Sequence, residues 1–85
     1  MRSVEFENDA YEHFLNWEKQ NKQIFDKIIK LLDEIRNTPF TGTGKPEALK
    51  HNLKGCWSRR INKEHRLVYQ VKPESIIVIS CKFHY

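Results

Sequence analysis

A carboxylate, a guanidinium and an imidazole stand at three distant points of the sequence, Glu47, Arg66 and His84. Together they could cleave the backbone of RNA, which supplies its own nucleophile, the 2′-OH. Such a cleavage needs a base that takes the 2′-OH proton, an acid that protonates the leaving 5′-oxygen, and a cation that stabilises the crowded phosphorane. Glu47 and His84 could be base and acid in either order, and Arg66 the cation, without a metal ion.

Positive charge is concentrated around these residues. The net charge is only +4, but the stretch from Lys45 to Arg66 has seven Lys or Arg against two Glu. A basic stretch after a nearly neutral N-terminal half favours an anionic partner, with nucleic acid first. A solvated basic face explains the same composition, and Glu47 could simply pair with Lys45 or Lys50. A lone histidine near a chain end is most often a surface residue.

The two cysteines, Cys56 and Cys81, are expected to be reduced and to pack as small hydrophobic residues. A zinc site that combines them with His51 and His65 is conceivable. Because the spacing contains no compact pair of ligands, the sequence does not favour this site.

The length of 85 residues predicts a single small domain, residues 1–85. Hydrophobic residues are 39% and charged residues 31%, which is typical of a soluble globular protein rather than a disordered one. No apolar run is long enough to span a bilayer, and the N-terminal MRSVEFENDA lacks the apolar core of a signal peptide. The sequence therefore predicts a cytoplasmic protein without a membrane partner.

Two helices joined by a short break are expected in the first half of the chain. The first runs over about residues 9–19, with Asn8 as its N-cap. Asn21 can cap a second helix, which residues 37–39 (Asn-Thr-Pro) end. An apolar stripe along the second helix is formed by Ile24, Ile28, Leu31, Leu32 and Ile35. Such a helical hairpin needs a cover for its apolar faces, and a sheet is the natural one.

The second half of the chain changes to the two-residue period of strands. A weak strand signal precedes the helices at RSVEF, and clearer ones follow the loop TPFTGTGKPE at CWSRRIN, HRLVYQV and SIIVISCKFHY. Tight turns between the last three predict an antiparallel meander. The last strand is apolar on both faces over residues 76–79, which predicts an interior position. The order of elements predicts an α+β fold, with an N-terminal strand and both helices on one face of an antiparallel sheet.

Strand register decides which polar side chains meet. We choose the register that pairs Arg60 with Arg66 across a three-residue loop. The open face then holds Ser58, Arg60, Arg66, Val68 and, if the last strand matches, Lys82 and His84. The face toward the helices holds Trp57, Ile61, Leu67, Tyr69, Ile77, Ile79 and Phe83. A strand that leads directly to His84 and Tyr85 would hold the chain end firmly.

The stretch GKPEALKHNLKGCWSRRINKEHRLVY, with the final HY, resembles the YoeB family of bacterial toxins within the wider RelE-type fold. The likeness runs over essentially the whole chain. It implies a toxin of a type II toxin–antitoxin pair that is an endoribonuclease and uses no metal or other cofactor. It also implies that messenger RNA is cut chiefly on the ribosome, with the codon in the A site, so that translation is inhibited.

The resemblance also implies roles for individual residues. Glu47 is the catalytic glutamate and Arg66 the transition-state arginine. His84 is then the acid, and Tyr85 stacks on a base or shapes the scissile phosphate. The RNA-binding candidates are Lys50, His51 and Arg60 from the resemblance, with Lys54 and Arg59 added from the same basic stretch.

The partners implied by the resemblance are a YefM-like antitoxin, the ribosome with its messenger RNA, and a second copy of the toxin as a further option. The antitoxin's C-terminal segment would wrap the toxin, and a basic face suits an acidic segment that folds on binding. Two other functions stay open. One is a binding module on this scaffold that blocks a protein target such as gyrase, and the other is RNA binding without chemistry.

Overall fold

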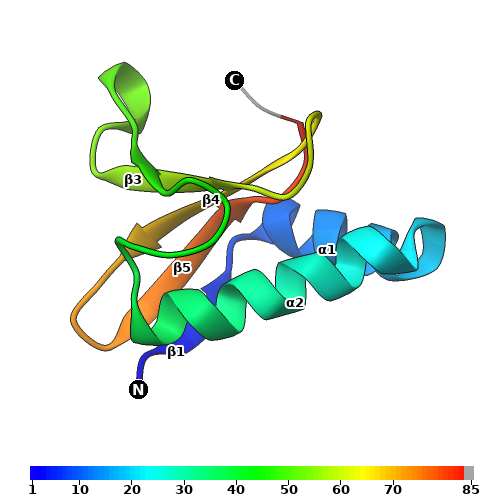
Figure 1. Cartoon of the computed structure of the whole chain (residues 1–85), viewed down its shortest axis with the longest axis horizontal. Coiled ribbons are helices and arrows are strands. Elements are labelled where there is room, and N and C mark those ends of the chain that lie inside the picture. The colour runs from blue at the N-terminus through cyan, green and yellow to red at the C-terminus, as the bar shows by residue number, and fades with distance from the viewer. Residues whose placement is uncertain (84–85) are drawn as a thin grey trace.

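The computed structural model describes residues 1–83 and places two helices on one face of a five-stranded sheet (Figure 1). The elements in chain order are β1 (Ser3–Phe6), α1 (Asn8–Gln20), α2 (Lys22–Asn37), β2 (Glu47–Ala48), the 3₁₀ helix η1 (His51–Leu53), β3 (Cys56–Arg60), β4 (Arg66–Val71) and β5 (Ser75–Ser80). This arrangement confirms the α+β class and the helical hairpin on one face. No helix in the described part is long and apolar enough to cross a membrane.

The strands lie in the order β1-β5-β4-β3-β2. As expected, β3, β4 and β5 form an antiparallel meander, and β5 is an interior strand. The expectation of a wholly antiparallel sheet is wrong, because β1 pairs with β5 in parallel, with Phe6 opposite Val78. A parallel pair needs a long connection, and here everything from α1 to β4 lies between the two strands. The short edge strand β2 also forms where only a loop was expected.

The helices begin and end close to the expected residues. Asn21 caps α2, since its Oδ1 accepts a hydrogen bond from the Ile24 N–H at 3.2 Å. The N-cap predicted for α1 is wrong, because Glu7 holds that position without a side-chain hydrogen bond and Asn8 is the first helical residue. The reason is that the helix starts directly after β1. The Glu7 N–H still donates to the Val78 carbonyl of β5 at 3.0 Å, so Glu7 is the last residue held by the sheet and the helix begins with Asn8.

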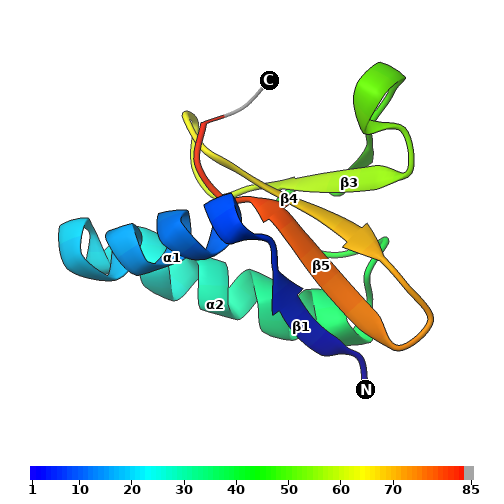
Figure 2. The same cartoon turned by 180° about the vertical axis from the view of Figure 1, so that it is seen from behind.

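The buried core residues come from both helices and from the sheet; Figure 2 shows from behind how the helices lie against the sheet. The stripe of α2 is buried as predicted, and it packs on sheet residues that are 0% exposed, namely Leu67, Tyr69, Ile76 and Val78. Full burial of such a side chain stabilises by about 1.5–3 kcal/mol. The apolar face of α2 therefore fixes which side of the sheet is covered and which stays open.

The predicted facing of the last strand is wrong. Ile76 and Val78 are buried against the helices, whereas Ile77 and Ile79 are only half-buried and Phe83 is 56% exposed. The sequence of β5 is apolar on both faces, so its alternation does not distinguish them. A β-bulge then shifts the register between β5 and β4, which reverses the alternation for the residues beyond it.

Candidate functional site

The open face of the sheet, away from the helices, brings together the predicted carboxylate and guanidinium groups. Glu47 on β2 lies opposite Ser58 on β3, and Ser58 lies opposite Val68 on β4. Two residues farther along β3 and β4, Arg60 lies opposite Arg66, which confirms the chosen register. Directly paired residues and residues two apart share a face, so Glu47, Arg60 and Arg66 project from the same side.

Only β3 separates the strands that carry Glu47 and Arg66. A strand spacing of about 4.8 Å and a rise of about 3.4 Å per residue put their Cα atoms about 12 Å apart. Long side chains can converge from that separation on one phosphate. Within residues 1–83 no ion pair joins Glu47 to a lysine or arginine, which argues against the simple pairing with Lys45 or Lys50.

Backbone hydrogen bonds hold the short strand that carries Glu47. The Leu49 N–H donates to the Cys56 carbonyl at 2.9 Å, and the Arg60 N–H donates to the Gly44 carbonyl at 2.7 Å. Gly44 has φ +87°, and a Cβ there would lie 3.0 Å from the Arg60 carbonyl oxygen. The close approach of this loop to β3 therefore requires glycine, and it brings Glu47 to the sheet edge.

Arg59 lies on the opposite side of β3 from Arg60 and is 0% exposed. Its guanidinium has five N–H donors, and their acceptors belong to Glu34, Thr38, Thr41, Thr43 and Tyr69. The shortest contact to a charged group is Nη1 to Glu34 Oε1, at 2.6 Å. The RNA-binding role predicted for Arg59 conflicts with this position, because no donor remains at the surface for a phosphate. Consecutive strand residues face opposite sides, so Arg59 and Arg60 cannot both line the open face.

The contacts of Arg59 tie the loop over residues 38–44 to α2. Glu34 also accepts hydrogen bonds from the N–H and the hydroxyl of Thr43. The Thr43 N–H, and after it the Thr43 hydroxyl and the Arg59 guanidinium, lower the pKa of the Glu34 carboxyl. Tyr69 Oη donates to the Pro39 carbonyl at 2.7 Å, and burial raises the pKa of this phenol. The loop that leads to Glu47 is thus anchored in the core.

Lys50, His51 and Lys54 lie on a short arm, residues 50–54, that contains η1. All three are exposed, and the arm projects from the sheet on the side away from the helices (Figure 1). The Lys54 N–H donates to the His51 carbonyl at 3.0 Å, which closes the turn. These predicted RNA-binding residues therefore add basic side chains next to the edge of the sheet at β2, where Glu47 lies.

The last described residues return to β4 beside Arg66. The Arg66 N–H donates to the Phe83 carbonyl at 2.9 Å, and the Phe83 N–H donates to His65 Nδ1 at 2.8 Å. The predicted catalytic residues His84 and Tyr85 follow Phe83 directly in the sequence and lie outside the described residues. Their roles stay predictions. The sequence had indicated His65 only as a zinc candidate, and nothing in its spacing showed this contact.

Lys82 does not lie on the open face as the register argument expected. Its ammonium lies 5.9 Å from the centre of the Trp17 ring and 5.2 Å from that of the Phe83 ring. Trp17 belongs to α1, so Lys82 is on the helical side. The reason is that β5 ends at Ser80, and strand alternation no longer applies beyond it.

The zinc site considered from the sequence is not formed in the part of the chain that the structure describes. No three His, Cys, Asp or Glu side chains come together there in a group that could hold a metal ion. Both cysteines are free thiols. Cys81 is 0% exposed, and its burial raises the pKa of the thiol to about 12, as expected for a small buried residue.

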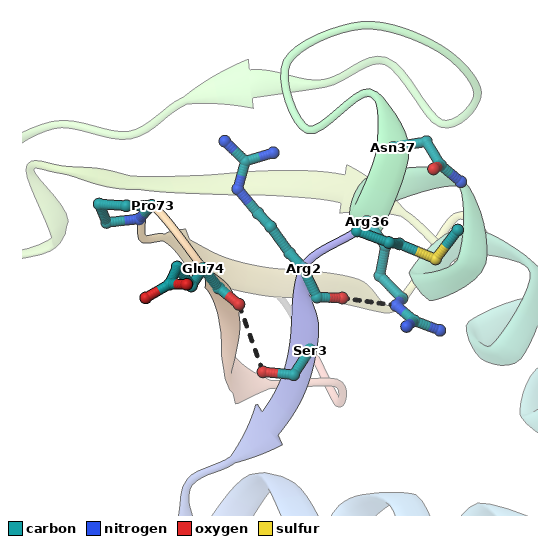
Figure 3. Close-up of a pocket in the computed structure, with 7 residues that line it drawn as sticks. Arg2, Ser3, Arg36, Asn37, Pro73 and Glu74 are labelled. Carbon is teal, nitrogen blue, oxygen red and sulfur yellow. Dashed lines mark hydrogen bonds between the residues drawn. The ribbon is translucent and has the colours of Figure 1, made fainter.

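Two hollows in the surface contain none of the predicted site residues that the structure describes. One of about 640 Å³ adjoins the start of α1 and includes Ile79. The other, of about 540 Å³, lies between β1 and the end of α2 (Figure 3). In it, Arg36 Nε donates to the Arg2 carbonyl at 2.6 Å, and the guanidinium groups of Arg2 and Arg36 point in different directions (Figure 3). The hydrogen bond from Arg36 therefore anchors the N-terminal strand, and the two guanidinium groups do not converge on a common anion site.

Comparison with known proteins identifies the family. The model for the YoeB-like toxin of bacterial type II toxin-antitoxin system matches residues 6–85. Toxin YoeB of Escherichia coli K12 is 49% identical over 77 residues, which are 91% of this chain and 92% of that protein. The YoeB–YefM complex from Staphylococcus aureus matches with a TM-score of 0.91 at 46% identity, covering 100% of this chain and 99% of that chain. The YoeB dimer from the same organism matches with a TM-score of 0.92 at 46% identity, covering 99% and 98%. These matches confirm the resemblance, and the chain belongs to the family of YoeB-like toxins of bacterial type II toxin–antitoxin systems.

Proposed function

We propose that this toxin is an endoribonuclease that cleaves messenger RNA in the ribosomal A site and thereby inhibits translation. The observation that carries the proposal is the shared face of Glu47 and Arg66, with only β3 between their strands. That face holds a carboxylate beside guanidinium groups and no described ion pair that would occupy Glu47. Membership of the toxin family supports the same activity.

The proposed reaction is an attack of the RNA on itself. Glu47 takes the proton of the 2′-OH, and the 2′-oxygen bonds to the adjacent phosphorus. The bond from phosphorus to the 5′-oxygen breaks, and His84 gives this leaving oxygen a proton. The products are a 2′,3′-cyclic phosphate and a 5′-OH, and exchanging the roles of Glu47 and His84 yields the same ends.

The guanidinium groups supply the positive charge that the transition state needs. Arg66 is half-buried, and its backbone N–H is hydrogen-bonded to Phe83. The backbone that carries its guanidinium is therefore held in place in the sheet. A guanidinium offers parallel N–H donors that match two oxygens of a phosphate. Donors held in place before the reaction stabilise developing charge without reorganisation. Arg60, which is exposed beside Arg66, serves the neighbouring backbone of the RNA.

The partners follow from the same face. The Staphylococcus aureus relative is known in a complex with YefM, and we propose an antitoxin of this kind for the present toxin. Its acidic segment would be attracted by the basic stretch between Lys45 and Arg66. A homodimer, as known for the same relative, is the second proposed assembly. The proposed substrate places the toxin in the cytoplasm, with the ribosome.

A purified cell-free translation system tests the proposal. The toxin, separated from its antitoxin, is added to a translated message, and new RNA ends are mapped with and without ribosomes. We expect cuts within codons, 2′,3′-cyclic phosphate ends, and a loss of rate of about 10²–10⁴-fold for Glu47→Gln. The matched control is Glu5→Gln, an exposed glutamate on β1 at the far edge of the sheet from β2.

Two results would contradict the proposal. Inhibition of translation without any new RNA ends would favour a module that blocks a protein target. Binding of RNA that weakens with salt, with no cleavage even on ribosomes, would favour an RNA-binding domain without chemistry.

A further inference from the structure

His65 is buried although it stands in an exposed turn. Its exposed fraction is 5%, while Asn62, Lys63 and Glu64 before it are exposed. The centre of its ring lies 4.7 Å from that of Trp17, edge to face, and 5.6 Å from that of Phe83. The imidazole thus joins α1, the β3–β4 turn and the C-terminal segment.

The hydrogen bonds of His65 select one form of its ring. Nδ1 accepts the Phe83 N–H at 2.8 Å, so the ring proton is on Nε2, which lies 3.6 Å from Glu64 Oε1. A cationic imidazole has donors at both nitrogens and no acceptor. Only the neutral ring with its proton on Nε2 can therefore hold the Phe83 N–H.

Phe83 is held on both sides of its backbone by two consecutive residues. The side chain of His65 binds its N–H, and the backbone N–H of Arg66 binds its carbonyl at 2.9 Å. Two residues earlier, Trp17 Nε1 donates to the Cys81 carbonyl at 2.8 Å. Phe83 has φ 61°, a left-handed conformation that is unfavourable for a bulky residue and persists only where the surroundings enforce it.

We infer that His65 is a positioning residue for the C-terminal catalytic end. By presenting Nδ1 to the Phe83 N–H, it enforces the left-handed turn at Phe83 and sets the direction in which the chain continues to His84. Arg66, which follows His65 in the sequence, is the residue proposed to bind the phosphate. The two hydrogen bonds therefore tie Phe83, the residue before His84, to the position on β4 that carries this guanidinium. The inference rests on the proposed function for its kinetic consequence.

Two substitutions of His65 separate the hydrogen bond from packing. In His65→Asn the amide oxygen is attached at the γ position, as Nδ1 is, so it keeps an acceptor for the Phe83 N–H but leaves a cavity. In His65→Leu the volume is better filled but the acceptor is lost. If His65 only fills space, the Leu variant is the more active one. If it positions the chain end, the Asn variant is.

Steady-state cleavage of messenger RNA on ribosomes, measured as kcat and KM, tests this directly. We expect kcat to fall about 10²-fold for His65→Leu, the scale of a misplaced catalytic group, with KM unchanged, and to recover at least tenfold in His65→Asn. A Leu variant with the kcat of the wild type, or an Asn variant as impaired as Leu, overturns the inference. Failure of the wild-type protein to cut RNA would instead overturn the proposed function.

A spectroscopic measurement tests the clamp without cleavage and without altering His65. In the Glu47→Gln protein, the ¹⁵N shifts of the imidazole report which ring nitrogen carries the proton. We expect the proton of His65 on Nε2, and slow exchange of the Phe83 amide compared with the exposed turn at Lys63. A proton on Nδ1, or a Phe83 amide that exchanges as fast as that of Lys63, overturns the inference whether or not the toxin cleaves RNA.

Discussion

Replacing Arg59 by methionine should unfold this protein at moderate temperature, although Arg59 is next in sequence to Arg60, a residue proposed to bind RNA. Methionine keeps most of the apolar stem but removes the guanidinium. The acceptors that lose their donors are the Glu34 carboxylate, the carbonyls of three threonines in the loop over residues 38–44, and the Tyr69 hydroxyl. The anchored loop that carries Glu47 to the sheet would then be released.

The magnitude follows from the burial of these groups. Removing one partner of a buried ion pair costs about 3–5 kcal/mol. The Glu34 side chain is 34% exposed and water can reach it, so we take the lower end, about 3 kcal/mol. A chain of 85 residues has a total stability of about 4–13 kcal/mol. A loss of about 3 kcal/mol lowers the Tm of a domain of this size by roughly 12–24 °C.

The matched control is Arg60→Met, the next residue on the same strand, which is exposed. Both variants are made in the Glu47→Gln background, which is expected to be inactive under the proposed function, and urea and thermal unfolding are followed by circular dichroism. We expect Arg60→Met to stay within about 0.5 kcal/mol of its parent. It should instead weaken the binding of single-stranded RNA and reduce the salt slope by about 0.7, one phosphate contact.

The opposite pattern would refute the reasoning. If Arg59→Met keeps the stability of its parent and loses salt-dependent RNA affinity, Arg59 faces the RNA and the buried network does not exist in solution. Equal stability losses in Arg59→Met and Arg60→Met would also contradict the opposite facing of the two side chains on β3.

Three further predictions concern the same loop and the core. The pKa of Glu34 is lowered, so the ionised carboxylate stabilises the fold at a pH above its ordinary pKa of 4.5, and this contribution is lost as the pH falls through the pKa of the folded state. The urea midpoint of wild type should therefore exceed that of Glu34→Gln at pH 7, and the difference should disappear in acid. A difference that does not change with pH would contradict this. Burial raises the pKa of Cys81 to about 12, so iodoacetamide at pH 8 should label the half-buried Cys56 first. Equal labelling of both cysteines in mass spectra of the folded protein would count against the burial of Cys81 in the core. Gly44→Ala should lower the Tm more than Gly55→Ala, because both have positive φ but only a Cβ at Gly44 meets backbone; the reverse order would argue against the close approach to β3.

Local features of the fold could be predicted because neighbouring residues decide them. The stripe of α2 repeats at helical spacing, and the Asn21 cap needs only a side chain and a backbone N–H three residues apart. The pairing of Arg60 with Arg66 follows from a short turn between two strands. Such contacts depend little on where the rest of the chain lies.

The facing of β5 and the partner of β1 could not be predicted in the same way. β5 is apolar on both sides, so either face could bury a similar area until the helices are placed. β1 has only four residues, and its parallel pairing with β5 depends on the position of everything in between. The bulge in β5 is decided by how it meets β4.

The sequence by itself determined the family and the types of residue that could act on RNA, since Glu47, Arg66, His84 and Tyr85 stand in a specific motif. Only the tertiary structure showed that Arg59 is fully buried and donates hydrogen bonds to Glu34, to Tyr69 and to the loop over residues 38–44. It also showed that His65 accepts a hydrogen bond from the Phe83 N–H and that Lys82 packs on Trp17. The physical reason is that the residue types and their spacing can be read directly from the sequence, whereas burial and hydrogen-bond partners depend on segments that folding brings together from distant parts of the chain.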